Sequence, residues 1–119
     1  MIGLAIALLA GDLGPPRDVR FIENPQWLQR PSWSDVSQFF PQTTAPQFQP
    51  VHTILVCAVT ASGRLTRCTV SVTPAGYERF GETALKLSTR FVMAPRTPDG
   101  RSVAGRWVRV PIIFQPPSD

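Results

Sequence analysis

The fold is decided by the stretch Thr53-Ile54-Leu55-Val56-Cys57-Ala58-Val59-Thr60-Ala61-Ser62-Gly63-Arg64-Leu65-Thr66-Arg67-Cys68-Thr69-Val70-Ser71-Val72. Two runs rich in β-branched and apolar residues flank a Ser-Gly pair, a pattern typical of two antiparallel strands joined by a tight turn. If Ser62-Gly63 is a two-residue loop, Ala61 faces Arg64 across the hairpin. The same register places Cys57 opposite Cys68.

This register predicts a disulfide between the two cysteines of the chain, Cys57 and Cys68. Direct cross-strand partners have Cα atoms about 4.5–5.5 Å apart, which is within bridging range. Two reduced core thiols are the alternative. A zinc site has little support, because two cysteines and the single His52 cannot supply four ligands. A disulfide in turn indicates an oxidising compartment.

Beyond the hairpin the apolar period changes from two to about three and a half. One helical stripe carries Phe80, Ala84, Leu87, Ser88 and Phe91, with Leu85 beside it. Pro95 prevents the helix from continuing, and after a turn at Pro98-Asp99-Gly100 a last strand is expected over 107–114.

The order strand, strand, helix, strand predicts the topology. Crossovers between strands are right-handed, and the third strand can pair antiparallel only on the far side of the first. We therefore predict an α+β fold of ββαβ type. It has a three-stranded antiparallel sheet of order 2-1-3, one main helix packed on one face, and a short N-terminal helix.

This order leaves the third strand at an edge of the sheet, where its backbone groups are unpaired. Pro111 agrees, since proline within a strand belongs at an edge or a bulge. An open edge accepts an extended peptide as an added strand. The residues predicted to form this peptide-binding edge are Arg109, Val110, Pro111, Ile112 and Ile113. The alternative is an edge covered by the N-terminal arm, or guarded by Arg106, Arg109 and Pro111.

Three segments are predicted along the chain. Residues 1–11 resemble a secretory signal, because Ile2 to Ala10 is an apolar run of nine residues followed by small ones. A mis-assigned start or the stub of a longer anchor are the alternatives, and the run is too short to span a membrane. Residues 12–50 form a Pro-rich arm or linker with a short helix over 32–40, and residues 51–115 form the folded domain. Tryptophans beside prolines in the arm either fasten it to the core or line a ligand groove.

The formal charge of +4 is concentrated in the second half, where nine basic residues face four acidic ones. Such a balance suits an anionic partner, or it marks a solvated surface, since the charges are dispersed. One histidine and the absence of a phosphate-binding glycine loop argue against an enzyme. We expect no cofactor, no metal and no nucleic-acid partner.

Several motifs together resemble the C-terminal domain of TonB-type proteins. They are Val59 to Leu65 (Val-x-x-Ser-Gly-Arg-Leu), Pro74 to Gly76, Phe80-Gly81-Glu82-x-Ala84-Leu85-Lys86, Phe91-x-Met93-x-Pro95, Asp99-Gly100-Arg101-x-Val103-x-Gly105 and Val110-Pro111-Ile112-x-Phe114. Upstream, Trp27-Leu28-x-Arg30-Pro31-Ser32 and Phe40-Pro41-x-x-x-Ala45 resemble a flanking segment of short proteobacterial members with paired cysteines.

This resemblance implies a periplasmic domain that binds a short "TonB box" peptide of outer-membrane receptors along its last strand, in association with transmembrane transport. A full transducer also has a membrane helix and a long proline-rich spacer. This chain departs from that pattern on both counts, because its apolar run at 2–10 is too short to span a membrane and about 40 residues separate that run from the domain. The resemblance thus favours a receptor-binding relative, with homodimerisation by edge pairing as a further option. The alternative function is a structural or cell-envelope-binding protein that has the fold but no receptor-peptide site.

Overall fold

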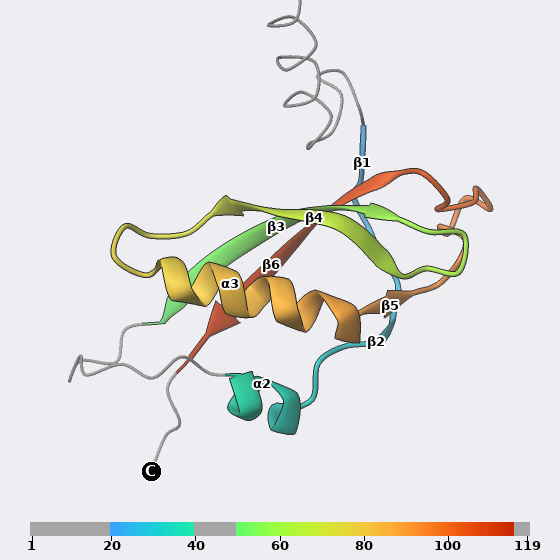
Figure 1. Ribbon diagram of the computed structural model, residues 1–119. Helices are drawn as coiled ribbons and strands as arrows, with labels where there is room; N and C mark the ends of the chain where they lie inside the picture. Colours follow the sequence, from blue (N-terminus) through green and yellow to red (C-terminus); the bar gives the residue numbers. More distant parts are fainter. Residues whose placement is uncertain (1–19, 40–49, 116–119) are drawn as a thin grey trace, which may run out of the picture.

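Two β-sheets and two α-helices make up the computed structural model, which describes residues 20–39 and 50–115. The larger sheet has the order β1-β6-β3-β4, and the smaller one pairs β2 with β5 (Figure 1). The strands are β1 (Phe21–Ile22), β2 (Trp27–Gln29), β3 (Val51–Val59), β4 (Leu65–Val72), β5 (Val92–Met93) and β6 (Trp107–Phe114). The helices are α2 (Trp33–Phe39) and α3 (Glu78–Leu87), the latter continued by the 3-10 turn η1 (Ser88–Arg90). The predicted signal at 1–11 lies outside the described residues.

The predicted three-stranded antiparallel sheet with one main helix is wrong. The sheet has a fourth strand, β1, which pairs parallel with β6, and a second sheet joins β2 to β5 antiparallel. Both extra strands that involve the arm are only two or three residues long. Segments this short show no alternation of apolar and polar residues, so only the edges that they pair with reveal them.

The hairpin between β3 and β4 turns differently from the predicted two-residue loop. Thr60 and Arg64 close a three-residue loop: the Thr60 N–H donates to the Arg64 carbonyl at 2.8 Å, and the Gly63 N–H to the Thr60 carbonyl at 3.0 Å. Gly63 adopts a φ of 85°, which makes this a type I turn followed by a glycine bulge. Near the turn, Val59 therefore faces Leu65 and Ala58 faces Thr66, one residue away from the predicted register.

A bulge in β4 restores the register and allows the predicted disulfide. Arg67 is an extra residue at a φ of 54°, and beyond it Val56 faces Thr69. Cys57 and Cys68 are joined by a disulfide with a Cα–Cα distance of 4.1 Å, which confirms their predicted pairing. Cys57 is fully buried, so the bond lies at the core side of the sheet.

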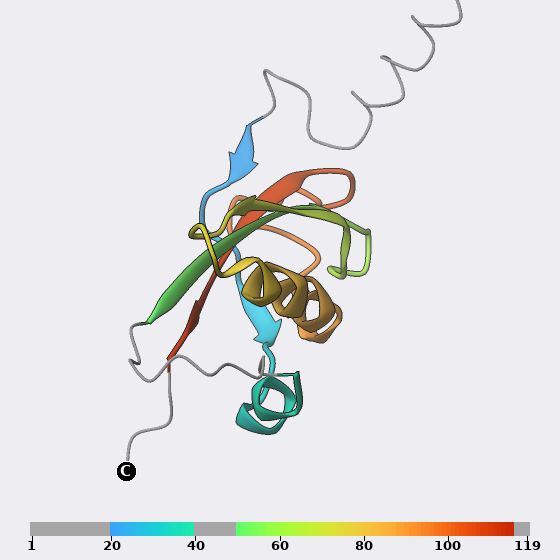
Figure 2. The same ribbon diagram turned by 60° about the vertical axis from the view of Figure 1, so that its left-hand side comes forward.

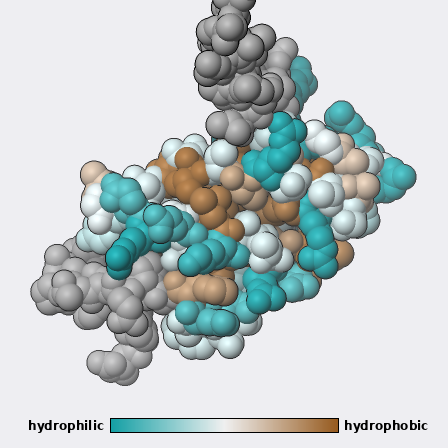
Figure 3. Space-filling model, in the orientation of Figure 1, coloured by the Kyte–Doolittle hydropathy of each residue, from teal (hydrophilic) through white to brown (hydrophobic). Residues whose placement is uncertain are grey.

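Helix α3 covers one face of the larger sheet, as two views show (Figures 1 and 2). Its buried residues are Phe80, Gly81, Thr83, Ala84 and Leu87. Phe91 lies beyond the helix but is also buried, because η1 carries the stripe one turn further. Charged side chains cover the outer surface of α3, and hydrophobic ones are visible between α3 and β4 (Figure 3).

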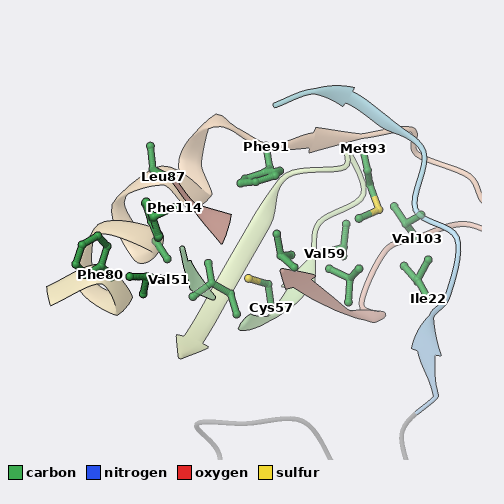
Figure 4. Close-up of a cluster of buried hydrophobic side chains, with 14 residues drawn as sticks. Ile22, Val51, Cys57, Val59, Phe80, Leu87, Phe91, Met93, Val103 and Phe114 are labelled. Atoms are coloured by element: carbon green, nitrogen blue, oxygen red, sulfur yellow. The ribbon is translucent and has the colours of Figure 1, made fainter. Parts of the chain in front are cut away.

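The core lies between α3 and the sheet (Figure 4). Phe80 from α3 meets Phe114 from β6 edge to face, with ring centroids 5.3 Å apart. Ile22 from β1 belongs to the same cluster of buried residues, and Trp27 from β2 packs against it. The arm therefore contributes to the core.

A second, smaller cluster occupies the opposite face of the sheet. Val56, Ala58 and Trp107 are buried there, with Phe21 packed against them. No helix covers this face in the part of the chain that the structure describes. Instead, the Arg109 guanidinium lies 3.6 Å from the Phe21 ring centroid and that of Arg67 5.5 Å from the Trp107 centroid. Arginine stems and rings thus shield the apolar residues from water.

Candidate edge-strand site

Strand β6 begins at a bulge that determines which of its backbone groups face outward. The Val59 N–H donates to the Arg106 carbonyl at 2.9 Å, and the Gly105 N–H donates to the Val59 carbonyl at 2.8 Å. Gly105 has a φ of 76°, as a bulge of this type requires. Val59 and Arg106 thus form a hydrogen-bonded pair.

Hydrogen-bonded and non-hydrogen-bonded pairs alternate along an antiparallel ladder. Counting from Val59 and Arg106, the pair Thr53–Ile112 is hydrogen-bonded and the pair Ile54–Pro111 is not. The Thr53 hydroxyl also donates to the Ile112 carbonyl at 2.9 Å, so this carbonyl faces β3. The backbone groups of Arg109, Pro111 and Ile113 therefore point away from β3, and Pro111 costs the β3–β6 ladder no hydrogen bond.

Strand β1 occupies the first part of this outer edge. Phe21 pairs with Trp107 and Ile22 with Val108. The prediction that the third strand is the terminal one is therefore wrong: β6 lies between β1 and β3. In the parallel pattern, Ile22 opposite Val108 uses the outward carbonyl of Trp107 and the outward N–H of Arg109, but not the Arg109 carbonyl. Among the described residues, no strand pairs with the outer edge beyond that point.

The remaining edge is rich in acceptors. The carbonyls of Arg109, Pro111 and Ile113 face outward, whereas Ile113 supplies the one outward N–H of this stretch, because Pro111 has none. The side chains along this edge differ in how far they are free to contact a guest. Arg109 is stacked on Phe21, whereas Ile113 is 50% exposed.

An apolar groove of about 430 Å³ runs beside this edge, on the α3 side of the sheet. Its floor contains Leu87, Phe91 and Val110, all buried. Ile112 and the edge residues Pro111 and Ile113 form one wall. The arm forms the other wall with Trp27, Arg30, Pro31 and Val36. The groove and the row of outward carbonyls are thus adjacent along β6.

The arm wall is held in place by three contacts. Trp27 meets Phe91 edge to face at 5.0 Å between ring centroids. The Ala94 N–H donates to the Gln26 carbonyl at 2.8 Å. Asp35 lies 3.6 Å from the Arg90 side chain across the gap between α2 and η1. These contacts fasten the arm wall to residues 90–94, which follow α3.

Helix α2 begins with a reciprocal cap. The Asp35 N–H donates to the Ser32 hydroxyl at 3.0 Å, and the Ser32 N–H donates to the Asp35 carboxylate at 2.9 Å. The pKa of Asp35 is lowered, first by the Ser32 backbone hydrogen bond, then by the Ser32 hydroxyl and the charge of Arg90.

The structure divides the five predicted edge residues between the two faces of the sheet. Val110 and Ile112 point toward α3 and line the groove, whereas Arg109, Pro111 and Ile113 alternate with them. Sequence reasoning did not find the groove residues Val36, Leu87 and Phe91. Leu87 and Phe91 were predicted only as members of the apolar stripe of the helix, and the one signal for a groove was the alternative role of the arm tryptophans as its lining.

A second hollow of about 320 Å³ lies between β1 and the turn at residues 97–101. Its lining includes Arg20, Arg101 and Arg106, together with the carboxylates Glu23 and Asp99. The Thr97 hydroxyl lowers the pKa of Asp99 most, followed by the Arg101 N–H and the charges of Arg101 and Arg106. Asp99 thus serves to hold the turn, and the charges of this hollow are mixed.

No protein-family model, no curated protein and no solved structure matches the chain. Residues 20–39 and 50–115 contain no helix with the length and apolar character needed to cross a membrane. Within the same residues, no group of three or more histidine, cysteine, aspartate or glutamate side chains is arranged to hold a metal ion.

Proposed function

We propose that this chain is a TonB-like domain of the periplasm that binds a peptide of an outer-membrane receptor by strand addition. The observation that carries the proposal is the outer edge of β6. Its carbonyls at Arg109, Pro111 and Ile113 have no strand partner among the described residues, and they border an apolar groove. An extended peptide offers N–H groups and alternating side chains, which suit these two features.

The disulfide between Cys57 and Cys68 supports the location, because such bonds persist in oxidising compartments. The motif resemblance to TonB C-terminal domains supports the partner. In this proposal the protein takes part in receptor-linked transport by holding the receptor peptide.

The test is an NMR titration of the full chain with a synthetic TonB-box peptide. We expect amide shifts at Arg109, Val110, Ile112 and Ile113, but none along β4 at the opposite edge. A peptide with N-methylated backbone amides is the control, because it keeps the side chains and loses the donors. No shift at millimolar peptide, or equal shifts with both peptides, would contradict strand addition.

A variant pair tests the edge itself. Ile113→Pro removes the outward N–H without removing a bond to β3, whereas Ile113→Val keeps it. We expect Ile113→Pro to weaken peptide binding and Ile113→Val to leave it nearly unchanged. The alternative function, a structural or cell-envelope-binding protein, is favoured by one observation: β1 already covers part of the edge. Unchanged spectra in the titration would support it.

A further inference from the structure

The alternation of side chains along a strand determines which residues of an added strand would point toward the groove beside β6. The guest residues opposite Arg109, Pro111 and Ile113 direct their side chains to the face without a helix, because opposite residues in a sheet share a face. The guest residues opposite Val110 and Ile112 direct theirs toward α3. These two guest residues are separated by one position, whichever way the guest strand runs.

The surface that these two side chains would meet is apolar. Trp27 and Val36 from the arm and Ile112 from β6 line it and are partly exposed, whereas the lining residues Val110 and Leu87 are buried. Arg30 is the one charged residue that lines the groove. A volume of about 430 Å³ falls within the range of roughly 300–1,000 Å³ that is usual for ligand sites.

The occupant is further limited by the backbone. Three outward carbonyls and one outward N–H call for a guest that donates at alternate positions. In an antiparallel guest these donors lie opposite Arg109, Pro111 and Ile113, so proline is disfavoured there. A strand can sit at this edge, since β1 of this chain does so at Trp107 and Val108. The groove is therefore continuous with an edge already used for strand pairing.

From these features we infer that the site selects an extended segment of a partner protein with apolar side chains at positions i and i+2. When this segment runs antiparallel to β6, its residues at i−1, i+1 and i+3 are not proline. This inference rests on the proposed function and deepens it. It states which side chains the groove accepts and which positions of the guest pair with the backbone of β6. Val36, Trp27 and Ile112 become specificity-determining residues.

The test compares two uncharged peptides of identical composition, acetyl-Thr-Thr-Leu-Thr-Leu-Thr-Thr-amide and acetyl-Thr-Thr-Leu-Leu-Thr-Thr-Thr-amide. Both have the same backbone donors, but only the first can place both leucines in the groove. We expect the first to bind about tenfold tighter or more, as judged by amide shifts along β6, because one more leucine is buried.

A matched pair of variants locates the effect. Val36→Thr keeps the shape and makes the groove wall polar, whereas Val72→Thr makes the same change at an exposed residue of β4. Val36→Thr should weaken the spaced peptide about three- to tenfold, and Val72→Thr should not. Amide spectra of the free variants check that each is folded.

The outcomes separate the inference from the function that it rests on. Equal binding of both peptides at the β6 edge would overturn the side-chain selectivity and leave strand addition intact. If neither peptide shifts the β6 amides, strand addition fails and the inference fails with it. A chain that sediments as a dimer, and that the spaced peptide does not dissociate, would assign the groove to a second copy and also overturn the inference.

Discussion

At the scale of single residues, Gly63 shows how one position joins two parts of the fold. Its φ of 85° closes the β3–β4 hairpin, and its carbonyl accepts the Met93 N–H at 2.8 Å. A Cβ at this position would lie 1.9 Å from the Met93 carbonyl oxygen. Glycine is thus required both for the turn and for the contact of the hairpin tip with β5.

We therefore expect Gly63→Ala to lower the free energy of unfolding by about 3 kcal/mol or more, since backbone strain and steric overlap both contribute. Gly100→Ala is the matched control: its φ is 86°, and nothing lies within 4 Å of an added Cβ. This control should cost only about 1–2 kcal/mol. Urea denaturation of both variants measures the difference, and equal losses would contradict the steric role of Gly63.

At the scale of elements, the short helix α2 depends on its N-terminal cap and on the ion pair with η1. It spans seven residues and has no fully buried residue. Helices this short are not stable alone in water, so the cap between Ser32 and Asp35 and the packing of Val36 and Phe39 hold it. Loss of the cap should loosen the wall of the groove.

This dependence predicts a pH effect. The folded pKa of Asp35 lies below the ordinary value of an aspartate, chiefly because the Ser32 N–H donates to the carboxylate. The stabilisation is therefore present above the unfolded pKa and is lost as the pH falls through the folded pKa. The amide shifts of residues 33–39 should report this loss below about pH 4. In Asp35→Asn the transition should vanish; its persistence there would assign it to another group.

At the scale of the whole molecule, the arm and the domain form one structure. β1 extends the larger sheet, β2 forms the smaller one with β5, and α2 packs against α3. The arm leaves the outer edge of β6 after Ile22 and then returns as the far wall of the groove. The arm thus both limits the candidate site and shapes it.

The Cys57–Cys68 disulfide joins β3 to β4 and stabilises the folded state, because it lowers the conformational entropy of the unfolded chain. With a sequence separation of 11, it should contribute about 2.5–3 kcal/mol to the free energy of unfolding in the chain-entropy model. Chemical denaturation with and without reductant measures this difference. The double variant Cys57→Ala/Cys68→Ala is the control, and its stability should not respond to reductant. If reductant also left the free energy of unfolding of the wild-type chain unchanged, the disulfide would be contradicted.

The amino-acid sequence alone determined the parts of this protein that depend on local pattern. The two β-runs from Thr53 to Val72, the apolar stripe of α3 and the facing cysteines follow from residue types and their spacing. Even so, the predicted pairing of the two strands near Gly63 was wrong by one residue, because a Ser-Gly pair fits both a two-residue loop and a three-residue loop. The bulge at Arg67 compensated for that error.

Only the tertiary structure decided the rest. Strands as short as β1 and β2 form because a neighbouring edge offers unpaired backbone groups. Pairing of this kind leaves no recognisable pattern of side chains in the sequence. The groove likewise joins Trp27, Val36, Leu87 and Val110, which are distant in the chain. Among the described residues, the path of the arm therefore settled which part of β6 is paired with β1, through backbone hydrogen bonds that do not depend on the side chains.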